Sequence, residues 1–201
     1  MPYSSFTLKR VRDELDLELA ERAGLFSNVE PRAISDHLRE TLAENVSLAV
    51  AINTEKARSE FIIAPVLIEI RRMLDRTISL FSGIELNVDR ERDLMGFCDF
   101  LISQSPEQFY LKTPVISIVE AKNENIMNGL GQCAAEMFAS RLYNEQEKAP
   151  VDKVYGVVSS GNLWKFLKLE KNILSIDLDD YAIKEITRIA GILFSMVRQQ
   201  A

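Results

Sequence analysis

Three short apolar segments between Thr77 and Lys122 constrain the fold of this chain more than any other feature of its sequence. They read TISLFSGIELNVD, LMGFCDFLIS and PVISIVEAK, and each is rich in β-branched and aromatic residues and bounded by Gly, Asn, Asp, Ser or Pro. Such composition is typical of β-strands, so the segments predict three successive strands. The third segment is apolar until its last residues, which indicates a strand inside a sheet.

The rest of the chain has helical periodicity. Apolar residues recur every three or four positions, and a strand pair with a turn at SSGN separates the last two helices. Gly24 is expected to end the first helix, and Ser35 or Asp36 to cap the second. Pro65 lacks a backbone donor and is expected to bend or break the third. The predicted helices cover residues 4–26, 35–53, 54–77, 128–145 and 179–200, and the strand pair covers residues 153–170.

This order of elements predicts an α/β fold in which a mixed β-sheet is flanked by helices. With 201 residues and 47% apolar content, the chain can bury one sizeable core, so a single domain over residues 1–201 is expected. No apolar run is long enough for a membrane span or a secretion signal. We therefore expect a cytoplasmic protein that does not interact with a membrane.

The composition excludes several classes of protein. The 30 acidic and 24 basic side chains give a formal charge of −6, which argues against coating nucleic acid by bulk electrostatics but leaves a local basic groove open. The single histidine, His37, is expected on a helix surface, which argues against histidine-based hydrolytic and zinc sites. Cys98 and Cys133 lack the spacing of a zinc site and are expected to be reduced.

Three charged residues lie in or next to the predicted strands. Asp99 stands within the second apolar segment, and Glu120 and Lys122 end the third. Residues two apart in a strand share a face, so Glu120 and Lys122 are expected to point the same way. Two carboxylates at adjacent strand ends suit a hard divalent cation, with the Ala121 carbonyl available as a third ligand. Lys122 would then stabilise a developing negative charge or assist an attacking water.

The spacing of these residues resembles a known signature. Asp99, followed after twenty intervening residues by Glu120, Ala121 and Lys122, resembles the metal-binding motif of the PD-(D/E)XK nuclease superfamily, which has the restriction-endonuclease-like fold. The order of elements is similar as well, with the aspartate on the second strand of a meander and Glu-x-Lys on the third. One difference is Cys98, which stands where the signature has proline.

Three further stretches extend the resemblance over residues 54–170. RSEFIIAPVLIEI resembles the helix that supplies an additional carboxylate in many members, and the match falls on Glu60. GLGQCAAEM resembles the helix after the motif, and its glutamine is Gln132. VYGVVSSGNLWKFLKLE is similar to a strand pair of such nuclease domains. On this basis residues 1–53 form an N-terminal helical extension, residues 54–170 a nuclease-like core and residues 171–201 a C-terminal helix.

The resemblance implies a divalent-metal-dependent nuclease that hydrolyses phosphodiester bonds, with DNA as the expected substrate. Mg²⁺ or Mn²⁺ would be held by Asp99, Glu120, the Ala121 carbonyl and Glu60. Lys122 would stabilise the developing negative charge or assist the attacking water. Gln132 would contact a phosphate or order Lys122.

Alternatives remain open from sequence alone. One is a catalytically silent module on the same fold that binds nucleic acid or a protein. Another is that the apolar face of the last helix forms a homodimer or partner-subunit surface rather than core. Glu60 and Glu124 would then be solvated charges, Gln132 would cap its helix, and Trp164 is expected to pack in the core. The basic residues that would line a phosphate groove, or simply be solvated, are Arg71, Arg72, Arg76, Lys165 and Lys168.

Overall fold

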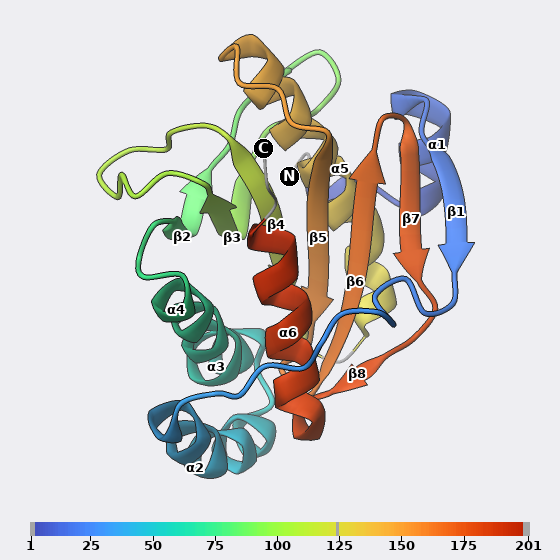
Figure 1. The fold of residues 1–201 in the computed structure, drawn as a ribbon. Coiled ribbons are helices and arrows are strands. Elements are labelled where there is room, and N and C mark those ends of the chain that lie inside the picture. The colour runs from blue at the N-terminus through green and yellow to red at the C-terminus, as the bar shows by residue number, and fades with distance from the viewer. Residues whose placement is uncertain (1–2, 124, 199–201) are drawn as a thin grey trace.

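The computed structural model describes residues 3–123 and 125–198 (Figure 1). Within them, eight strands form one mixed sheet in the order β1-β7-β6-β5-β4-β3-β2, with β8 paired to β6. The strands are β1 Glu18–Arg22, β2 Ser79–Glu85, β3 Phe97–Ser103, β4 Val115–Ala121, β5 Lys153–Ser159, β6 Leu163–Glu170, β7 Ile173–Asp177 and β8 Tyr181–Ala182. The fold is α/β with a mixed sheet, as the sequence predicts.

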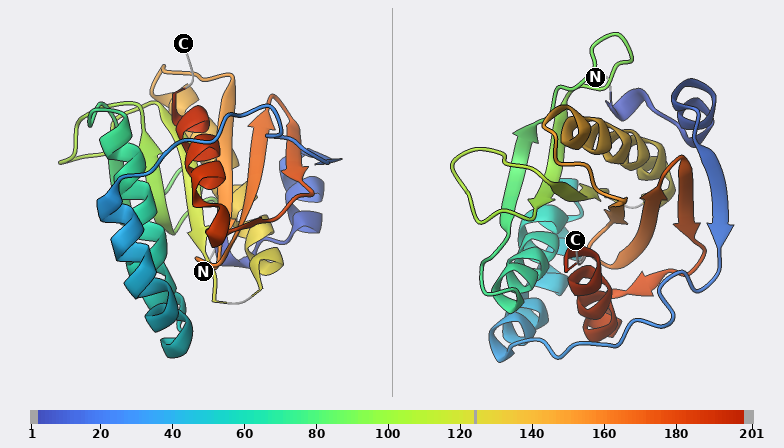
Figure 2. Two further views of the ribbon diagram at one scale, coloured as in Figure 1. Left: turned by 60° about the horizontal axis from the view of Figure 1, so that its bottom comes forward. Right: turned by 45° about the horizontal axis from the view of Figure 1, so that its top comes forward.

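Helices cover both faces of the sheet (Figures 1 and 2). One face carries α2, α3, α4 and α6, the other carries α1 and α5, and an apolar cluster fills each interface. The α-helices are α1 Leu8–Leu15, α2 Asp36–Ile52, α3 Glu55–Arg58, α4 Ala64–Met73, α5 Leu130–Gln146 and α6 Ile186–Val197. A π-helix spans η2 Ser59–Ile63, and 3₁₀-helices span η1 Tyr3–Ser5, η3 Ile126–Gly129 and η4 Ile183–Glu185.

The three predicted strands are confirmed as β2, β3 and β4. Every residue of β4 is buried, and this strand lies between β3 and β5 inside the sheet. β4 runs antiparallel to β3 and parallel to β5. The predicted strand pair forms the β5–β6 hairpin, and Trp164 is fully buried in the core.

The third predicted helix is confirmed, but it is irregular. The Thr54 side chain caps α3, and the chain then widens into the π-helix η2 before α4 begins. Pro65 lies in the first turn of α4, directly after the π-helical turn. Because proline lacks a backbone donor, it disrupts regular helical hydrogen bonding, and the π-helical turn accommodates it within one continuous helical segment.

The prediction of one helix over residues 4–26 is wrong. α1 ends at Leu15, Asp16 takes a left-handed conformation with φ of 53°, and the following residues form β1, parallel to β7. The helical spacing of leucines continues into β1, but pairing with a strand from the far end of the chain overrides it. Residues 1–53 are therefore not only helical, and residues 171–201 contain β7 and β8 besides α6.

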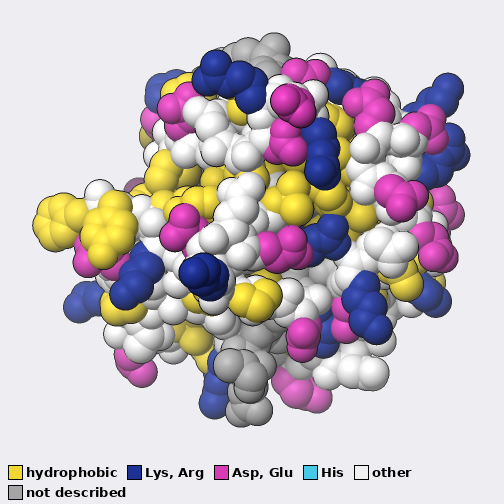
Figure 3. All heavy atoms as spheres, turned by 90° about the horizontal axis from the view of Figure 1, so that it is seen from above, with side chains coloured by type: hydrophobic (Ala, Val, Ile, Leu, Met, Phe, Trp, Pro, Cys, Tyr) yellow, Lys and Arg dark blue, Asp and Glu magenta, His cyan; other side chains and the backbone are white. Residues whose placement is uncertain are grey.

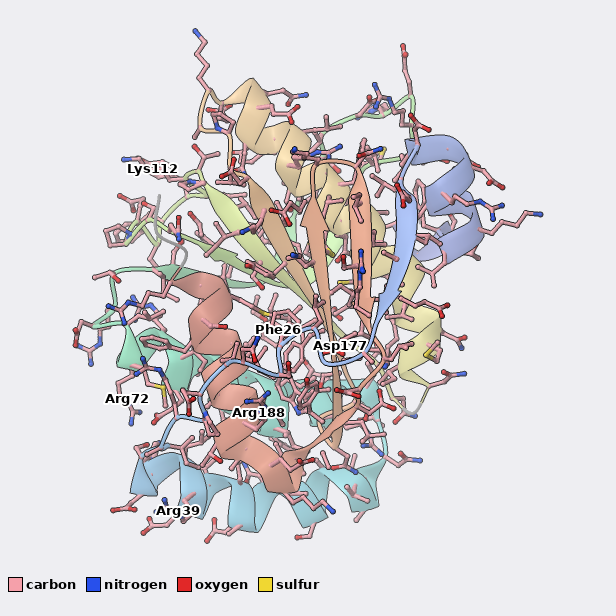
Figure 4. The ribbon with its side chains drawn as sticks, turned by 45° about the vertical axis from the view of Figure 1, so that its right-hand side comes forward. Phe26, Arg39, Arg72, Lys112, Asp177 and Arg188 are labelled. Carbon is pink, nitrogen blue, oxygen red and sulfur yellow. The ribbon has the colours of Figure 1, made fainter. Side chains whose placement is uncertain are left out.

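The last helix belongs to the core. Ile189, Leu193 and Val197 of α6 are buried against the sheet, so the apolar stripe is core rather than a free surface. The segment before α2 passes over α6, where the Arg188 guanidinium donates to the Phe26 carbonyl at 2.6 Å (Figure 4). No helix within the described residues has the length and apolarity needed to cross a membrane.

Candidate functional site

Asp99 and Glu120 meet at one edge of the sheet. Because β3 and β4 are antiparallel, the beginning of β3 lies beside the end of β4. The paired register of these strands reaches Phe100 and Val119, and beyond it Asp99 Oδ2 accepts a hydrogen bond from the Ala121 amide at 2.8 Å. The Asp99 side chain therefore continues the strand pairing where the backbone ladder stops.

Glu120 and Lys122 point to the same face of the sheet, as predicted, and their side chains form an ion pair. Glu120 is 1% exposed, whereas Lys122 is half-buried. Glu120 Oε1 accepts from the Lys122 ammonium, but Glu120 Oε2 is buried and has no hydrogen-bond partner within the described residues. When Glu120 is protonated, its carboxyl group can hydrogen-bond to Asp99. When Glu120 is ionised, a buried carboxylate oxygen without a donor is costly, so the folded chain then has an unmet demand for a donor or a cation here.

α5 extends the polar cluster below Lys122. Gln132 Oε1 lies 3.4 Å from Lys122 Nζ, and Gln132 Nε2 donates to Glu136 Oε1 at 3.1 Å. Glu136 is fully buried, and its Oε2 also lacks a partner within the residues described. Since Glu136 accepts from the amide nitrogen, the amide oxygen of Gln132 is directed to Lys122. The structure thus places Gln132 where it orders Lys122, and α5 has no side-chain cap.

The electrostatics of the cluster favour protons on its acids. Burial raises the pKa of Glu120 to about 8; the Asp99 carboxylate adds to this shift, and the charge and hydrogen bond of Lys122 oppose it. Burial also raises the pKa of Asp99, although the Ala121 amide opposes the change. Burial and then the charge of Glu120 raise the pKa of Glu136. Burial lowers the pKa of Lys122, but Glu120, Glu55 and Asp99 together raise it by more, so the net shift is upward and the ammonium stays charged.

Two cavities adjoin at this edge, and Glu55 and Asp99 line both. The first, of about 260 Å³, lies against α3 and β2 and also includes Glu60 and Ala121. The second, of about 280 Å³, lies against the N-terminal segment and α5 and also includes Glu120, Lys122, Gln132 and Phe97. Solvent and small ligands can therefore approach Asp99 from both cavities and Glu120 from the second cavity.

Glu55 is the site residue that the sequence analysis missed. Its charge raises the pKa of both Glu120 and Lys122, which places it near them. Glu60 lines only the first of these two cavities and forms an ion pair with Lys56 at 2.6 Å. Glu60 lies in the stretch that the resemblance singled out, whereas Glu55 lies just before that stretch, at the first position after the Thr54 cap.

The oxygen atoms at this site are of the kind that a hard divalent cation binds, but only two carboxylates would serve as ligands. Glu120 Oε2 is a carboxyl oxygen that accepts from no donor within the described residues, and it becomes an anionic ligand when Glu120 loses its proton. Within residues 3–123 and 125–198, no group of three or more His, Cys, Asp or Glu side chains is arranged to hold a metal ion. Asp99 and Glu120 would therefore supply the carboxylates, with the Ala121 carbonyl and water as further ligands. Mg²⁺ tolerates such a shell because it retains several waters.

A buried arginine fixes the loop after Lys122. Arg58 is 6% exposed and donates to Asn123 Oδ1 at 3.1 Å, to the Ser160 carbonyl at 3.0 Å and to Asn53 Oδ1 at 2.9 Å. The backbone of Lys122 is also held, by a bond of 2.8 Å to the Ser159 carbonyl. These bonds tie α3 to the ends of β4 and β5, so the carboxylates and Lys122 are presented by a fixed frame.

The remaining candidates lie elsewhere. Lys165 is buried and bonds to backbone carbonyls near Asp177, Lys168 pairs with Glu170, and Arg71 and Arg72 bond within their own region, so they form no common groove with the site. His37 is an exposed residue of α2. Glu124 lies outside the described residues. The free cysteines, Cys98 and Cys133, are buried, which raises the pKa of each thiol and keeps it unreactive.

Comparison of the chain with protein-family models gives no matching family, and comparison with curated proteins gives no match.

Proposed function

We propose that this chain is a divalent-metal-dependent nuclease of the PD-(D/E)XK type, with a restriction-endonuclease-like core, that hydrolyses phosphodiester bonds in DNA. The observation that carries the proposal is the edge where Asp99, Glu120 and Lys122 meet beside two cavities while Glu120 Oε2 lacks a partner in the described chain. Purely structural buried acids are satisfied by donors. An unsatisfied one beside a cavity suits a cation that arrives with the substrate.

Each residue has a role that follows from its geometry. Asp99 and Glu120 would hold Mg²⁺ or Mn²⁺, which when bound polarises the scissile phosphate and lowers the pKa of the attacking water. Hydrolysis forms one bond from water oxygen to phosphorus and breaks one ester bond, giving a phosphate monoester and a hydroxyl. Lys122 keeps its proton, so it stabilises the charge that develops on the phosphate rather than acting as a base.

The supporting side chains keep these groups in place. Gln132 holds Lys122 from below, and Arg58 holds the loop that follows it. Glu55 lines both cavities and is the better placed of the two helix glutamates to take part. Glu60 would contribute only through a water or a second ion, after giving up its ion pair with Lys56.

The test is cleavage of supercoiled, linear and single-stranded DNA by the wild type and Asp99→Asn, with Mg²⁺, Mn²⁺ or EDTA. Asparagine keeps the acceptor for the Ala121 amide, so the variant folds while it loses the negative charge. Asp152→Asn is the matched control, because Asp152 is an exposed aspartate just before β5. Metal-dependent cleavage that Asp99→Asn loses and Asp152→Asn retains would support the proposal, and folded Asp99→Asn that still cuts would refute it.

The competing function is a catalytically silent module that binds nucleic acid or protein. The net charge of −6 favours it, because a nuclease that acts on a polyanion gains from a basic surface. The retained Lys122 and the unsatisfied Glu120 oxygen argue against it. A wild type that binds Mn²⁺ in an Asp99-dependent way would exclude a relic site, whereas no binding would favour the silent module.

A further inference from the structure

A solvent-exposed phenylalanine stands at the mouth of the candidate active site. Phe97 begins β3, is 62% exposed and lines the same cavity as Asp99, Lys122 and Gln132. A single apolar side chain at a protein surface is common. Phe97 differs in its place, because it lines a polar cavity and belongs to neither apolar cluster of the described chain, which leaves its ring free to contact a ligand in that cavity.

The position of Phe97 is fixed by its surroundings. Gly96 has φ of +141°, and a Cβ there would lie 3.1 Å from the Tyr3 ring, so only glycine lets the buried Tyr3 pack against this backbone. The Gly96 carbonyl accepts from the Leu86 amide at 2.8 Å, and the Gly96 amide donates to Asn87 Oδ1 at 3.0 Å. Phe97 therefore projects from a rigid point rather than from a loose loop.

The spacing of Phe97 and Asp99 along the strand is comparable to a nucleotide. The two residues line the same cavity, and residues two apart in a strand are about 7 Å apart. A nucleobase lies at a similar distance from its own phosphate. A phosphate held between Asp99 and Lys122 would therefore place an adjacent base at the ring of Phe97, and a cavity of about 280 Å³ suits a single nucleotide.

We infer that Phe97 is a stacking platform for an unpaired base next to the scissile phosphate, and that the substrate is single-stranded DNA. This inference rests on the proposed function and adds the substrate class. In a double helix each base is already stacked on its neighbours on both faces, so no face is free to stack on the Phe97 ring. A single strand offers these faces freely, and every base has one, so the contact is strong without being sequence-specific.

The charge of the molecule agrees with this substrate. Duplex binding without base contacts depends on many lysine and arginine contacts to phosphates. The two cavities contain Lys56 and Lys122 as their cations, together with the acidic side chains of Glu55, Glu60, Asp99 and Glu120. With so few cations at the site, stacking has to provide much of the binding free energy.

The chain offers a matched control aromatic. Phe109 is 99% exposed in the loop between β3 and β4, at the opposite end of these strands from Asp99. Viewed from above, the molecule has projecting apolar side chains at its rim and intermixed acidic and basic ones (Figure 3). Phe109→Ala removes an exposed ring of the same kind without touching the two cavities at the site.

The test measures cleavage and binding separately. Phe97→Ala, Phe97→Trp and Phe109→Ala are made in the wild type for cleavage, and in Asp99→Asn for equilibrium binding of a fluorescein-labelled oligothymidylate and a blunt duplex. Phe97→Ala is expected to weaken single-strand binding about five- to hundredfold, the range for loss of one stacked base. Phe97→Trp is expected to restore it, and Phe109→Ala to have no effect. Thermal unfolding checks that every variant is folded.

The outcomes separate this inference from the proposed function. Phe97→Ala that binds and cuts single strands like Phe109→Ala would overturn the inference and leave the nuclease intact, as would a wild type that prefers duplex. If the wild type cuts no DNA, the nuclease proposal fails. Phe97-dependent binding of the oligothymidylate would then still support the platform, and its absence would overturn that as well.

Discussion

Two lysines of this sheet region have opposite surroundings. Glu120 in β4 pairs with Val158 in β5, and Val158 pairs with Lys165 in β6, so Lys165 lies two strands from Glu120, the partner of Lys122. Lys165 is 5% exposed. It donates to the carbonyls of three residues at the end of β7 and just after it, and it pairs with Asp180 at 2.8 Å.

The buried acid beside Lys165 is satisfied as well. Asp177 is fully buried, and its carboxylate accepts from Tyr181 Oη at 3.0 Å and from the amides of Asp179 and Leu25 at 3.2 and 3.4 Å. Around Lys122, in contrast, one buried oxygen of Glu120 and one of Glu136 lack partners within the described chain. Buried charge therefore does not mark a site by itself. An unsatisfied charge beside a cavity does.

Asp99→Asn should have the largest effect of any single change. We expect cleavage to fall at least about a thousandfold, in keeping with loss of a metal ligand. The free energy of unfolding should stay equal or rise, because a buried acid is neutralised while its hydrogen bond to Ala121 is kept. Steady-state cleavage and urea unfolding measure the two quantities, and a stability loss larger than the activity loss would contradict the comparison.

Lys165→Met should show the reverse of Asp99→Asn, a loss of folding stability. Removing Lys165 leaves one buried and two partly buried carbonyls without their donor, so the free energy of unfolding should fall by about 3 kcal/mol. Lys122→Met should cost less than half as much, because Lys122 lowers the pKa of Glu120 and without it Glu120 stays protonated and neutral at pH 7. Urea unfolding of both variants at pH 7 decides the matter. Equal losses would mean that the two clusters are both structural.

Stability should also depend on pH through the Glu120 cluster. Glu120 has a pKa of about 8 in the folded chain against an ordinary 4.5, so the folded protein binds this proton more tightly than the unfolded one. The resulting stability is fully present below about pH 4.5 and is lost as the pH rises through 8, at up to about 1.4 kcal/mol per pH unit. Urea unfolding in EDTA from pH 5 to 8.5 measures this fall, which Glu120→Gln should flatten.

Mn²⁺ should oppose the loss of folding stability at high pH. A cation that binds the ionised acids stabilises the folded state only where the acids are ionised, so the melting temperature should rise more at pH 8.5 than at pH 5. Asp99→Asn should abolish the rise and Lys165→Met should keep it. Equal shifts at both pH values would show that the ion binds elsewhere.

The smallest expected effect distinguishes two glutamates of one helix. Glu55→Gln should lower cleavage about tenfold, because Glu55 acts on Glu120 and Lys122 from both cavities. Glu60→Gln should change it less than about twofold, since Glu60 is engaged with Lys56. Parallel cleavage assays of the two variants give the result, and a larger loss with Glu60→Gln would restore the assignment made from sequence.

Sequence alone predicts the parts of this molecule that depend on local pattern. Charges inside apolar segments pointed to Asp99, Glu120 and Lys122, and antiparallel pairing of adjacent strands brought them together. Glu55 was missed because it and Glu60 occupy similar polar positions, and only the tertiary structure decides which one faces the strand ends. Glu136 carried a signal that went unused: an acid four residues after Gln132 in a helix that is otherwise largely buried.

The parts that failed depend on distant partners. The stretch that became β1 has leucines at helical spacing, and nothing within it shows that β7 will pair with it. A residue in a left-handed conformation, Asp16, ends α1 without a glycine or proline to announce it. Such outcomes are set by long-range pairing, which no local window contains.

The pairing of β1 with β7 also sets an order in time. The Leu25 amide and the Asp177 carboxylate that it contacts are 152 positions apart in the chain, and the strands beside them are equally distant. Contacts of such separation form slowly, and during synthesis β1 has to wait for β7 to emerge. Until then β1 has no strand to pair with, and the backbone groups of β6 that would bond to β7 are unpaired. A chain stalled before Ile173 would therefore be prone to pair with a strand of another molecule. Completion of the C-terminal segment is thus the step that protects the nascent protein from aggregation.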